Sequence, residues 1–286
     1  MSERVLIVGA GQVGRGLSNA FRAARIDVLG LHGRRASAWT TSSGALPRSI
    51  SDANTIVLAV RDNQIDDAIA ELLNENQRGG RGRIASGTVI VHTSGSAEPE
   101  LISRLTEFGL SGGTFHPLVP FANPERVPEL MKHAWIGIDG DDPARSTSRR
   151  LAGHVGARTL DIPPGGKPLY HAAAVMSSNF PVVLARLASH VLASLGIPER
   201  SAQHAVQGLM EAAVSNLAET SPVEALTGPI VRGETDTIIR HLSALRKDPE
   251  ARAVYKRLSI SALEIAAERG VAPEAIEEMR RALLLR

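Results

Sequence analysis

A glycine-rich turn near the N-terminus constrains the fold of this chain more than any other feature. Val5–Val8 is a short, β-branched apolar run, and Gly9, Gly11 and Gly14 follow it in the spacing Gly-x-Gly-x-x-Gly. A helical pattern starts directly afterwards. In such a unit the first glycine permits the turn, the second lets a pyrophosphate approach the backbone, and the third allows close packing of helix on strand. The sequence therefore predicts a dinucleotide site.

The start of the helix should contribute to the same site. Gln12 and Val13 open a helical pattern that runs on to Ala24. The first N–H groups of a helix have no intrahelical acceptor and attract anions. We therefore expect Gln12 and Val13 to bind the cofactor together with the three glycines.

The end of the second expected strand predicts which dinucleotide binds. Enzymes that use NAD place an acidic residue there, about 20 residues after the glycines. This chain instead carries Arg34 and Arg35 after the strand Val28–Leu31. A pair of guanidinium groups can bind a phosphate through bidentate, charge-assisted hydrogen bonds. The expected cofactor is therefore NADP.

Short apolar runs alternate with helical patterns through the first half of the chain. The helical patterns include Val13–Ala24 and Ile65–Asn74. This alternation is typical of a doubly wound parallel sheet, the Rossmann fold, which we assign to residues 1–162. The expected strands are Val5–Val8, Val28–Leu31, Ile56–Val60, Val89–Val91, Ala134–Ile138 and Arg158–Asp161.

The second half of the chain has a different composition and periodicity. Pro163–Gly166 is a strong break, and Ala- and Leu-rich segments with helical spacing follow it. We expect an all-helical domain over residues 163–286, with Pro181 kinking or interrupting its first helix. The expected helices are Leu169–Leu195, Glu199–Glu219, Glu234–Leu245, Glu250–Arg269 and Pro273–Leu285.

Polar residues follow three of the strand segments of the first domain. Ligands bind at the carboxyl edge of open parallel sheets, so Val60, Arg61, Thr93 and Ser94 are expected to contact the cofactor. His116 leaves a third segment and is a candidate catalytic residue, although a hydrogen-bonded structural histidine is an equally good interpretation.

Lys167 and His171 are the main catalytic candidates. They are four residues apart and so share one face at the start of a long helix, with Asn179 two turns further on. A lysine at this end of a helix opposes the dipole, which an anion opposite it would explain; cofactor or substrate could supply that anion. Lys167 or His171 could then donate the proton that accompanies hydride transfer.

Composition excludes several other functions. The 286 residues contain no cysteine, which rules out disulfides, thiolate catalysis and Cys-based metal sites. The formal net charge is only +2, and we expect no nucleic acid partner. The basic run Arg78–Arg83 is interpreted as a solvated connector rather than an RNA-binding segment. We find neither a signal peptide nor a membrane span, and expect a cytoplasmic protein.

Taken together, these motifs resemble a little-characterised group that pairs a Rossmann-like domain with domain of unknown function 2520. Besides the glycine turn, the resemblance rests on four segments of this chain. They are His92–Gly95; Phe115–Leu118; Lys167, Tyr170–Ala174 and Asn179; and Gly228, Pro229, Arg232, Gly233, Thr237 and His241.

The group is similar to pyrroline-5-carboxylate reductase, ketopantoate reductase and the β-hydroxyacid dehydrogenases. This resemblance implies a helical domain like that of 6-phosphogluconate dehydrogenase, dimerisation through that domain, and reduction of a small substrate between the domains. The β-hydroxyacid dehydrogenases have asparagine four residues after their catalytic lysine, where this chain has His171. That departure leaves the identity of the proton donor open.

We expect an NADP-dependent oxidoreductase that reduces a small keto-acid-like carbonyl or an imine. Three alternatives stay open at this point. One is a cyclic-imine reductase, another is an enzyme that uses deazaflavin, and the third is a non-catalytic NADP-binding sensor or scaffold.

Overall fold

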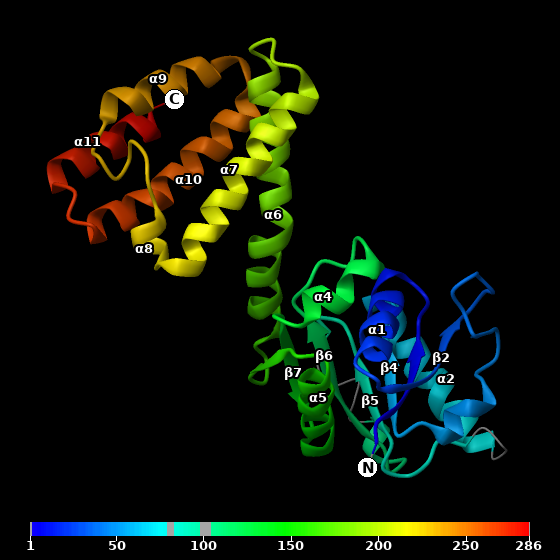
Figure 1. Cartoon of the computed structure of the whole chain (residues 1–286). Helices are drawn as coiled ribbons and strands as arrows, with labels where there is room; N and C mark the ends of the chain where they lie inside the picture. Colours follow the sequence, from blue (N-terminus) through cyan, green and yellow to red (C-terminus); the bar gives the residue numbers. More distant parts are fainter. Residues whose placement is uncertain (1, 79–82, 98–103, 286) are drawn as a thin grey trace. The chain divides into compact units, whose positions relative to one another are not determined.

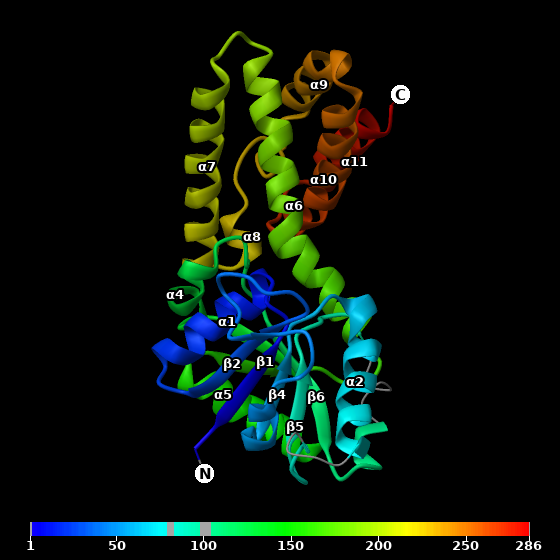
Figure 2. The same cartoon turned by 90° about the vertical axis from the view of Figure 1, so that its right-hand side faces the viewer.

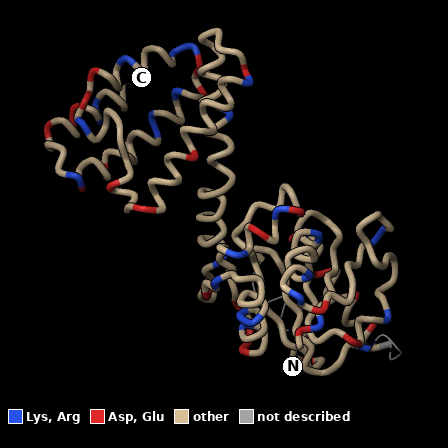
Figure 3. The backbone as a smooth tube through the Cα atoms, viewed as in Figure 1, with Lys and Arg blue, Asp and Glu red and all other residues tan. Residues whose placement is uncertain are grey.

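The computed structural model describes residues 2–78, 83–97 and 104–285. Contacts divide the chain into two compact units, Met1–Ser178 and Asn179–Arg286. Helix α6 (Lys167–Ala193) contributes its first turns to the first unit and the remainder to the second (Figure 1). Most of the basic run Arg78–Arg83 lies outside the described residues. Elsewhere, acidic and basic residues alternate along both units (Figure 3).

Within the described residues, the first unit contains one eight-stranded sheet of order β3-β2-β1-β4-β5-β6-β7-β8. All six expected strands are present, and the predicted Rossmann-like sheet is confirmed. The strands are β1 (Arg4–Val8), β2 (Asp27–Gly33), β3 (Ser42–Ser43), β4 (Thr55–Leu58), β5 (Val89–His92), β6 (Ser111–Pro117), β7 (Trp135–Gly140) and β8 (Arg158–Asp161).

The sheet differs from the expectation at β6 and at its far edge. The β6 sequence is not rich in β-branched residues, and β6 is not among the six expected strands. β7 runs antiparallel to β6, with Thr114 paired with Asp139, and β8 is parallel to β7. A side chain at Gly113 would lie 2.3 Å from the Asp139 carbonyl oxygen. Close pairing of backbones thus explains why this strand is rich in glycine.

Alternation along the strands distributes their side chains between the two faces of the sheet. Val5 and Ile7 pack in a cluster with Phe21 of α1 (Gln12–Ala23). Leu6 and Val8 pack on the opposite face with α2 (Ile65–Arg78). Figure 2 shows these helices on opposite sides. The first face is also covered by α4 (Val127–Met131) and α5 (Asp142–His154).

Short 3₁₀ segments complete the first unit. They are η1 (Arg48–Asp52), η2 (Asp62–Gln64) and η3 (Pro124–Arg126). Of these, η2 directly follows the carboxyl end of β4 and leads into α2, so its residues lie at the edge where a ligand is expected.

The second unit is helical, as predicted. Its small core contains Ile238, Leu242, Leu263, Met279 and Leu283. Pro181 lies inside α6 but does not interrupt it. After α6 come α7 (Glu199–Glu219), α8 (Pro222–Ala225), α9 (Thr235–Ala244), η4 (Leu245–Lys247), α10 (Pro249–Glu268) and α11 (Pro273–Leu284).

Candidate active site

The glycine turn has the geometry that a phosphate site requires. Gly9 has a φ of +116°, and a Cβ there would lie 2.2 Å from the Ala59 carbonyl oxygen. At Gly14 a Cβ would lie 1.8 Å from the Gly9 carbonyl oxygen. Gly11, in contrast, is exposed, and a Cβ there would have no atom within 4 Å. Two glycines are therefore required by packing, whereas the third leaves open space in front of the first amides of α1.

The other predicted cofactor residues surround this turn. Gln12 is exposed at the first turn of α1, and Val13 next to it is partly buried. Arg34 and Arg35 are exposed directly after β2. β2 pairs with β1, so the arginines and the glycine turn follow the carboxyl ends of neighbouring strands.

A contact between an arginine and an aromatic ring involves Trp39, which follows Arg34 and Arg35 closely in the sequence. The guanidinium carbon of Arg15, in α1, lies 3.8 Å from the centroid of the Trp39 ring, in the segment after Arg35. Trp39 is 53% exposed, which is unusual for a large aromatic side chain. Sequence reasoning missed both residues, since the pairing exists only when α1 and the segment after β2 come together.

The next strand ends continue the same edge. Val60 and Arg61 follow β4, and Thr93 and Ser94 follow β5. Arg61 is exposed, whereas the Ser94 hydroxyl is buried and accepts hydrogen bonds from the amides of Ser96 and Ala97. Of these predicted residues, Arg61 is available to a ligand. Ser94 instead stabilises its own loop, after β5, through these two hydrogen bonds.

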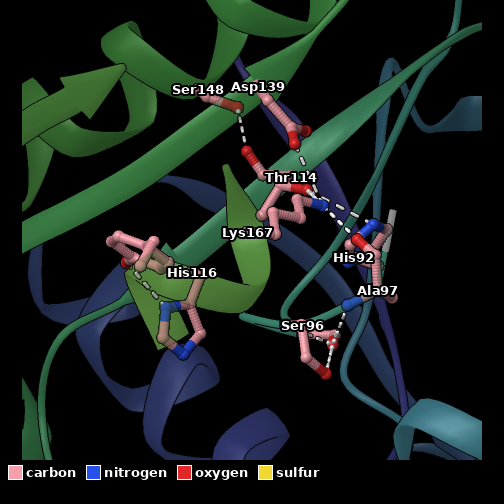
Figure 4. Close-up of polar contacts among 10 residues, drawn as sticks. His92, Ser96, Ala97, Thr114, His116, Asp139, Ser148 and Lys167 are labelled. Atoms are coloured by element: carbon pink, nitrogen blue, oxygen red, sulfur yellow. Dashed lines mark hydrogen bonds and ion pairs between the residues drawn. The ribbon is translucent and has the colours of Figure 1, made fainter. Parts of the chain in front are cut away.

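Lys167 is held in a buried polar network (Figure 4). Only 1% of its side chain is exposed. Its ammonium donates to Thr114 Oγ1 at 2.6 Å and to the carbonyl oxygen of Ala97, and it pairs with Asp139 Oδ2 at 3.0 Å. The anion opposite the lysine is therefore a carboxylate of this chain, not the cofactor or substrate that the sequence analysis suggested. Asp139 was missed because it lies within a strand, where a carboxylate carries no motif.

His92 borders this network and is neutral. Its Nε2 lies 3.3 Å from Thr114 Oγ1. Burial, assisted by the Lys167 charge, lowers the pKa of His92 to about 3. Within the described residues, His92 Nδ1 and Asp139 Oδ1 are buried without hydrogen-bond partners. His92 and Asp139 therefore each have one buried polar atom that has no partner among the described residues.

A second cluster joins β6 to the first turns of α6. His116 Nδ1 lies 2.8 Å from the Tyr170 hydroxyl, and the rings of His116 and His171 are 5.8 Å apart at their centroids. Burial, reinforced by His171, lowers the pKa of His116 to about 4. Burial raises the pKa of Tyr170, opposed by a backbone hydrogen bond from Gly137. His116 Nδ1 and the Tyr170 hydroxyl are hydrogen-bonded, and the tautomer of the neutral His116 ring determines which of the two donates.

Gly95 lies directly against both histidines. A Cβ at Gly95 would lie 2.6 Å from His171 Nδ1 and 2.8 Å from His116 Cε1. His171 Nδ1 is buried and has no hydrogen-bond partner among the described residues. The loop after β5 therefore brings backbone close to two imidazoles, and the His171 ring has a buried nitrogen without a partner among the described residues.

Of the four catalytic candidates, three gather in the first unit, namely Lys167, His171 and His116. Asn179 is exposed and is the first residue of the second unit. It stays a prediction, as do the roles of the others.

The remaining motif forms a separate cluster in the second unit. Arg232 pairs with Glu234 at 2.6 Å, and the Thr237 hydroxyl donates to Glu234 at 3.3 Å. His241, one helical turn further, lies 2.9 Å from the hydroxyl of Tyr255. These contacts engage Glu234, Thr237 and His241 with side chains of the same unit.

Two protein-family models match the chain. Residues 2–117 match the model described as a Rossmann-like domain, and residues 134–262 match the domain of unknown function DUF2520. No curated protein matches the chain.

Several solved structures share the fold across nearly the whole chain. TM1727 from Thermotoga maritima has a TM-score of 0.69 at 21% identity, covering 93% of this chain and 100% of that one. BF3122 from Bacteroides fragilis, a candidate NADP oxidoreductase, scores 0.68 at 22% identity and covers 91% and 97%. NADP-bound pyrroline carboxylate reductase from Plasmodium falciparum scores 0.61 at 14% identity, covering 98% of both chains.

An imine reductase from Pseudomonas scores 0.63 at 16% identity, covering 99% of this chain and 100% of that one. At these identities the likeness shows the fold. The predicted resemblance is confirmed: this chain joins a Rossmann-like domain to a domain of unknown function, DUF2520.

Proposed function

We propose that the protein is an oxidoreductase that uses NADPH to reduce a small carbonyl or imine. The observation that carries this proposal is the open space at Gly11, beside two glycines that packing makes obligatory. An exposed arginine pair on the neighbouring strand adds the charge that a 2′-phosphate needs. The described fold is also that of a pyrroline carboxylate reductase with NADP bound.

The choice of cofactor is tested by calorimetry with NADPH and NADH. We expect binding of NADPH, and a weaker preference for it over NADH in an Arg34→Gln, Arg35→Gln double variant, because two charge-assisted hydrogen-bond donors are lost. Loss of roughly 1–3 kcal/mol of discrimination would fit this role. Equal affinity of the wild-type protein for NADPH and NADH would count against NADP, and binding of a deazaflavin instead would favour that alternative cofactor.

Two histidines at the edge of the sheet, His116 and His171, support the proposed chemistry. The nicotinamide of NADPH would supply the hydride. In this proposal His116 donates a proton from Nε2 to the oxygen or nitrogen that gains electrons, and the hydrogen bond between Nδ1 and the Tyr170 hydroxyl fixes the ring. His171 offers a ring nitrogen for orienting the substrate. With a pKa of about 4, His116 acts as a neutral donor near pH 7.

Substrate class is tested by following NADPH oxidation with keto acids, aldehydes, acyclic imines and cyclic imines. Structural neighbours that are imine reductases, together with pyrroline carboxylate reductases, support the inclusion of C=N substrates. Replacing His116 with Asn should lower turnover by a factor on the order of 10²–10⁴ if it donates the proton. Tight NADPH binding without turnover on any compound class would instead support the sensor or scaffold.

We also propose that the second unit forms a homodimer. In this unit α6 and α7 border a groove of about 1120 Å³ whose walls include Pro181, Val182, Ala185, Met210 and Val214. Val182 is 70% exposed and Val214 66%. Soluble proteins seldom leave such an apolar patch open to water. The groove is flanked by long helices with apolar and small side chains, so the helices of a second copy are suitable occupants.

A membrane is the other environment that could cover this surface. Within the described residues, α6 alone is long and apolar enough to span a bilayer by length and composition, and only 6% of its most apolar window is buried. α6 therefore differs from the expectation that no stretch of this chain is long and apolar enough for a membrane span. Two charged residues, Lys167 and Arg186, lie in α6, and the ammonium of Lys167 is committed to a carboxylate of the sheet. The dimer, and a cytoplasmic location, are therefore what we propose.

A further inference from the structure

The contacts of Lys167 account for every donor on its ammonium group. A lysine ammonium has three N–H donors. Among the described residues, its acceptors include the carbonyl oxygen of Ala97, the hydroxyl of Thr114 and the carboxylate of Asp139. The side chain is 1% exposed. A substrate atom would have to displace one of these acceptors to receive a proton from Lys167.

The same three acceptors come from three different segments. Ala97 lies in the loop after β5, Thr114 is in β6, and Asp139 is in β7. Lys167 is the first residue of α6. One ammonium group thus ties the start of this helix to three parts of the sheet edge (Figure 4).

The positions that follow Lys167 carry the histidine cluster. Tyr170 and His171 come three and four residues later, which places them on the side of α6 that Lys167 occupies. Tyr170 is hydrogen-bonded to His116 of β6, two residues after Thr114, and His171 lies against Gly95, two residues before Ala97. Each Lys167 contact therefore anchors a segment that contributes to the cluster.

We propose that Lys167 is a positioning residue and not the proton donor. Its ion pair with Asp139 fixes the first turns of α6, so that Tyr170 and His171 face His116 in one arrangement. This inference rests on the proposed reductase function for its kinetic test only, since the arrangement of the rings can be measured without a substrate.

The kinetic test compares a single with a double substitution. Lys167→Met leaves Asp139 buried and unpaired, and turnover with the substrate found above should fall about 100-fold. Lys167→Met combined with Asp139→Leu removes both charges and keeps similar volumes, so turnover should return to within about tenfold of wild type. Lys167→Arg keeps the charge, but its planar fork does not match the three acceptors, and it should not restore turnover.

A double variant as inactive as Lys167→Met, with wild-type NADPH affinity and melting temperature, would identify Lys167 as the proton donor and overturn the inference. A double variant with the wild-type pH dependence of kcat would support it, because the titrating donor is then still present.

The structural test uses ¹⁵N NMR of the histidine rings in the full chain without cofactor. We expect Nε2 protonation of the neutral His116 ring in the wild-type protein and in the double variant, and a changed His116 signal in folded Lys167→Met. An unchanged signal in all variants would remove the positioning role. Absence of any NADPH oxidation by the wild-type protein would refute the proposed function while leaving this result in place.

Discussion

At the scale of single residues, glycines in this protein have two different tasks. Gly14 cannot carry a side chain, because the Gly9 carbonyl oxygen occupies that position. Gly11 has free space and an exposed backbone. Sequence spacing predicts both glycines as cofactor residues. Only the structure shows that packing requires glycine at position 14, whereas position 11 leaves room for a ligand.

A valine at each of these glycines should therefore have opposite effects. Gly11→Val should raise the Kd for NADPH at least about tenfold without changing the melting temperature, since its side chain fills only the space for the phosphate. Gly14→Val is the matched control and should unfold more readily, because its Cβ overlaps backbone. Calorimetry and thermal denaturation measure the two effects. Unaltered NADPH affinity in Gly11→Val would show that phosphate does not bind at this turn.

Acid sensitivity is also decided by single residues, and His92 is the clearest case. Its pKa is about 3 in the folded protein and 6.5 ordinarily, so below pH 6.5 only the unfolded chain takes up this proton. The free energy of unfolding should therefore fall as the pH drops from about 6.5 towards 3, by up to about 1.4 kcal/mol per pH unit for this group.

His92→Asn keeps a polar side chain near Thr114 but cannot take up the proton. Its unfolding free energy, from urea denaturation between pH 7 and pH 4 (roughly the window of this proton uptake), should depend less steeply on pH than that of the wild-type protein. Parallel pH profiles for the two proteins would contradict the buried, neutral state of His92.

At the scale of elements, the carboxyl ends and the amino ends of the strands have different roles. The carboxyl ends of β1, β4 and β5 carry the proposed cofactor residues. At the opposite end of β1, Glu3 is 7% exposed, pairs with Arg150 of α5 at 2.6 Å and accepts from the Thr55 hydroxyl at 3.3 Å. This contact joins α5 to the first strand and lies at the amino end, away from the proposed chemistry.

Breaking this contact should affect stability alone. Glu3→Gln should lower the free energy of unfolding by ~1–3 kcal/mol, since a charged hydrogen bond is lost at a buried position. NADPH affinity should stay at the wild-type value. Glu129→Gln breaks an exposed pair with Lys132 and is the control, for which we expect no measurable change. Denaturant unfolding measures the stability and calorimetry measures the NADPH affinity. A reduced NADPH affinity in Glu3→Gln would show that the amino and carboxyl ends of the strands are coupled.

At the scale of the whole molecule, each unit has its own core, and the helical unit leaves much apolar surface exposed. Leu209 on α7 is 74% exposed, and Phe180 on α6 is 52% exposed. A monomer would leave these side chains in water at a cost of about 25 cal/mol per Å² of apolar surface. Association of two copies, as proposed above, would remove this cost.

A charge within the groove should therefore prevent dimerisation. Val214→Glu and Val182→Glu each place a carboxylate in the groove wall and should give monomers in sedimentation velocity experiments, because burying an unpaired charge is costly. Ile239→Glu, on α9 outside the groove and 50% exposed in the wild-type protein, should remain dimeric. Wild-type protein that sediments as a monomer at all concentrations, or Val214→Glu that stays dimeric, would refute this interface.

The sequence alone determined the features that depend on neighbours along the chain. The glycine turn, the six expected strands and the helices of the second half follow from local periodicity and turn chemistry, and α7 has the predicted bounds, Glu199–Glu219. Strand β6 was not predicted as an element, because close pairing with β7 favours glycine over the side chains that mark a strand.

Only the tertiary structure showed which groups the candidate site residues contact. Sequence spacing placed Lys167 and His171 on one helical face, but it could not show that Asp139, distant in the sequence, lies opposite the lysine at 3.0 Å. It also could not show that Tyr170 meets His116 at 2.8 Å. The ionisation and hydrogen bonding of a side chain depend on burial and on partners from other strands. These are set by how the strands assemble, which no local motif records.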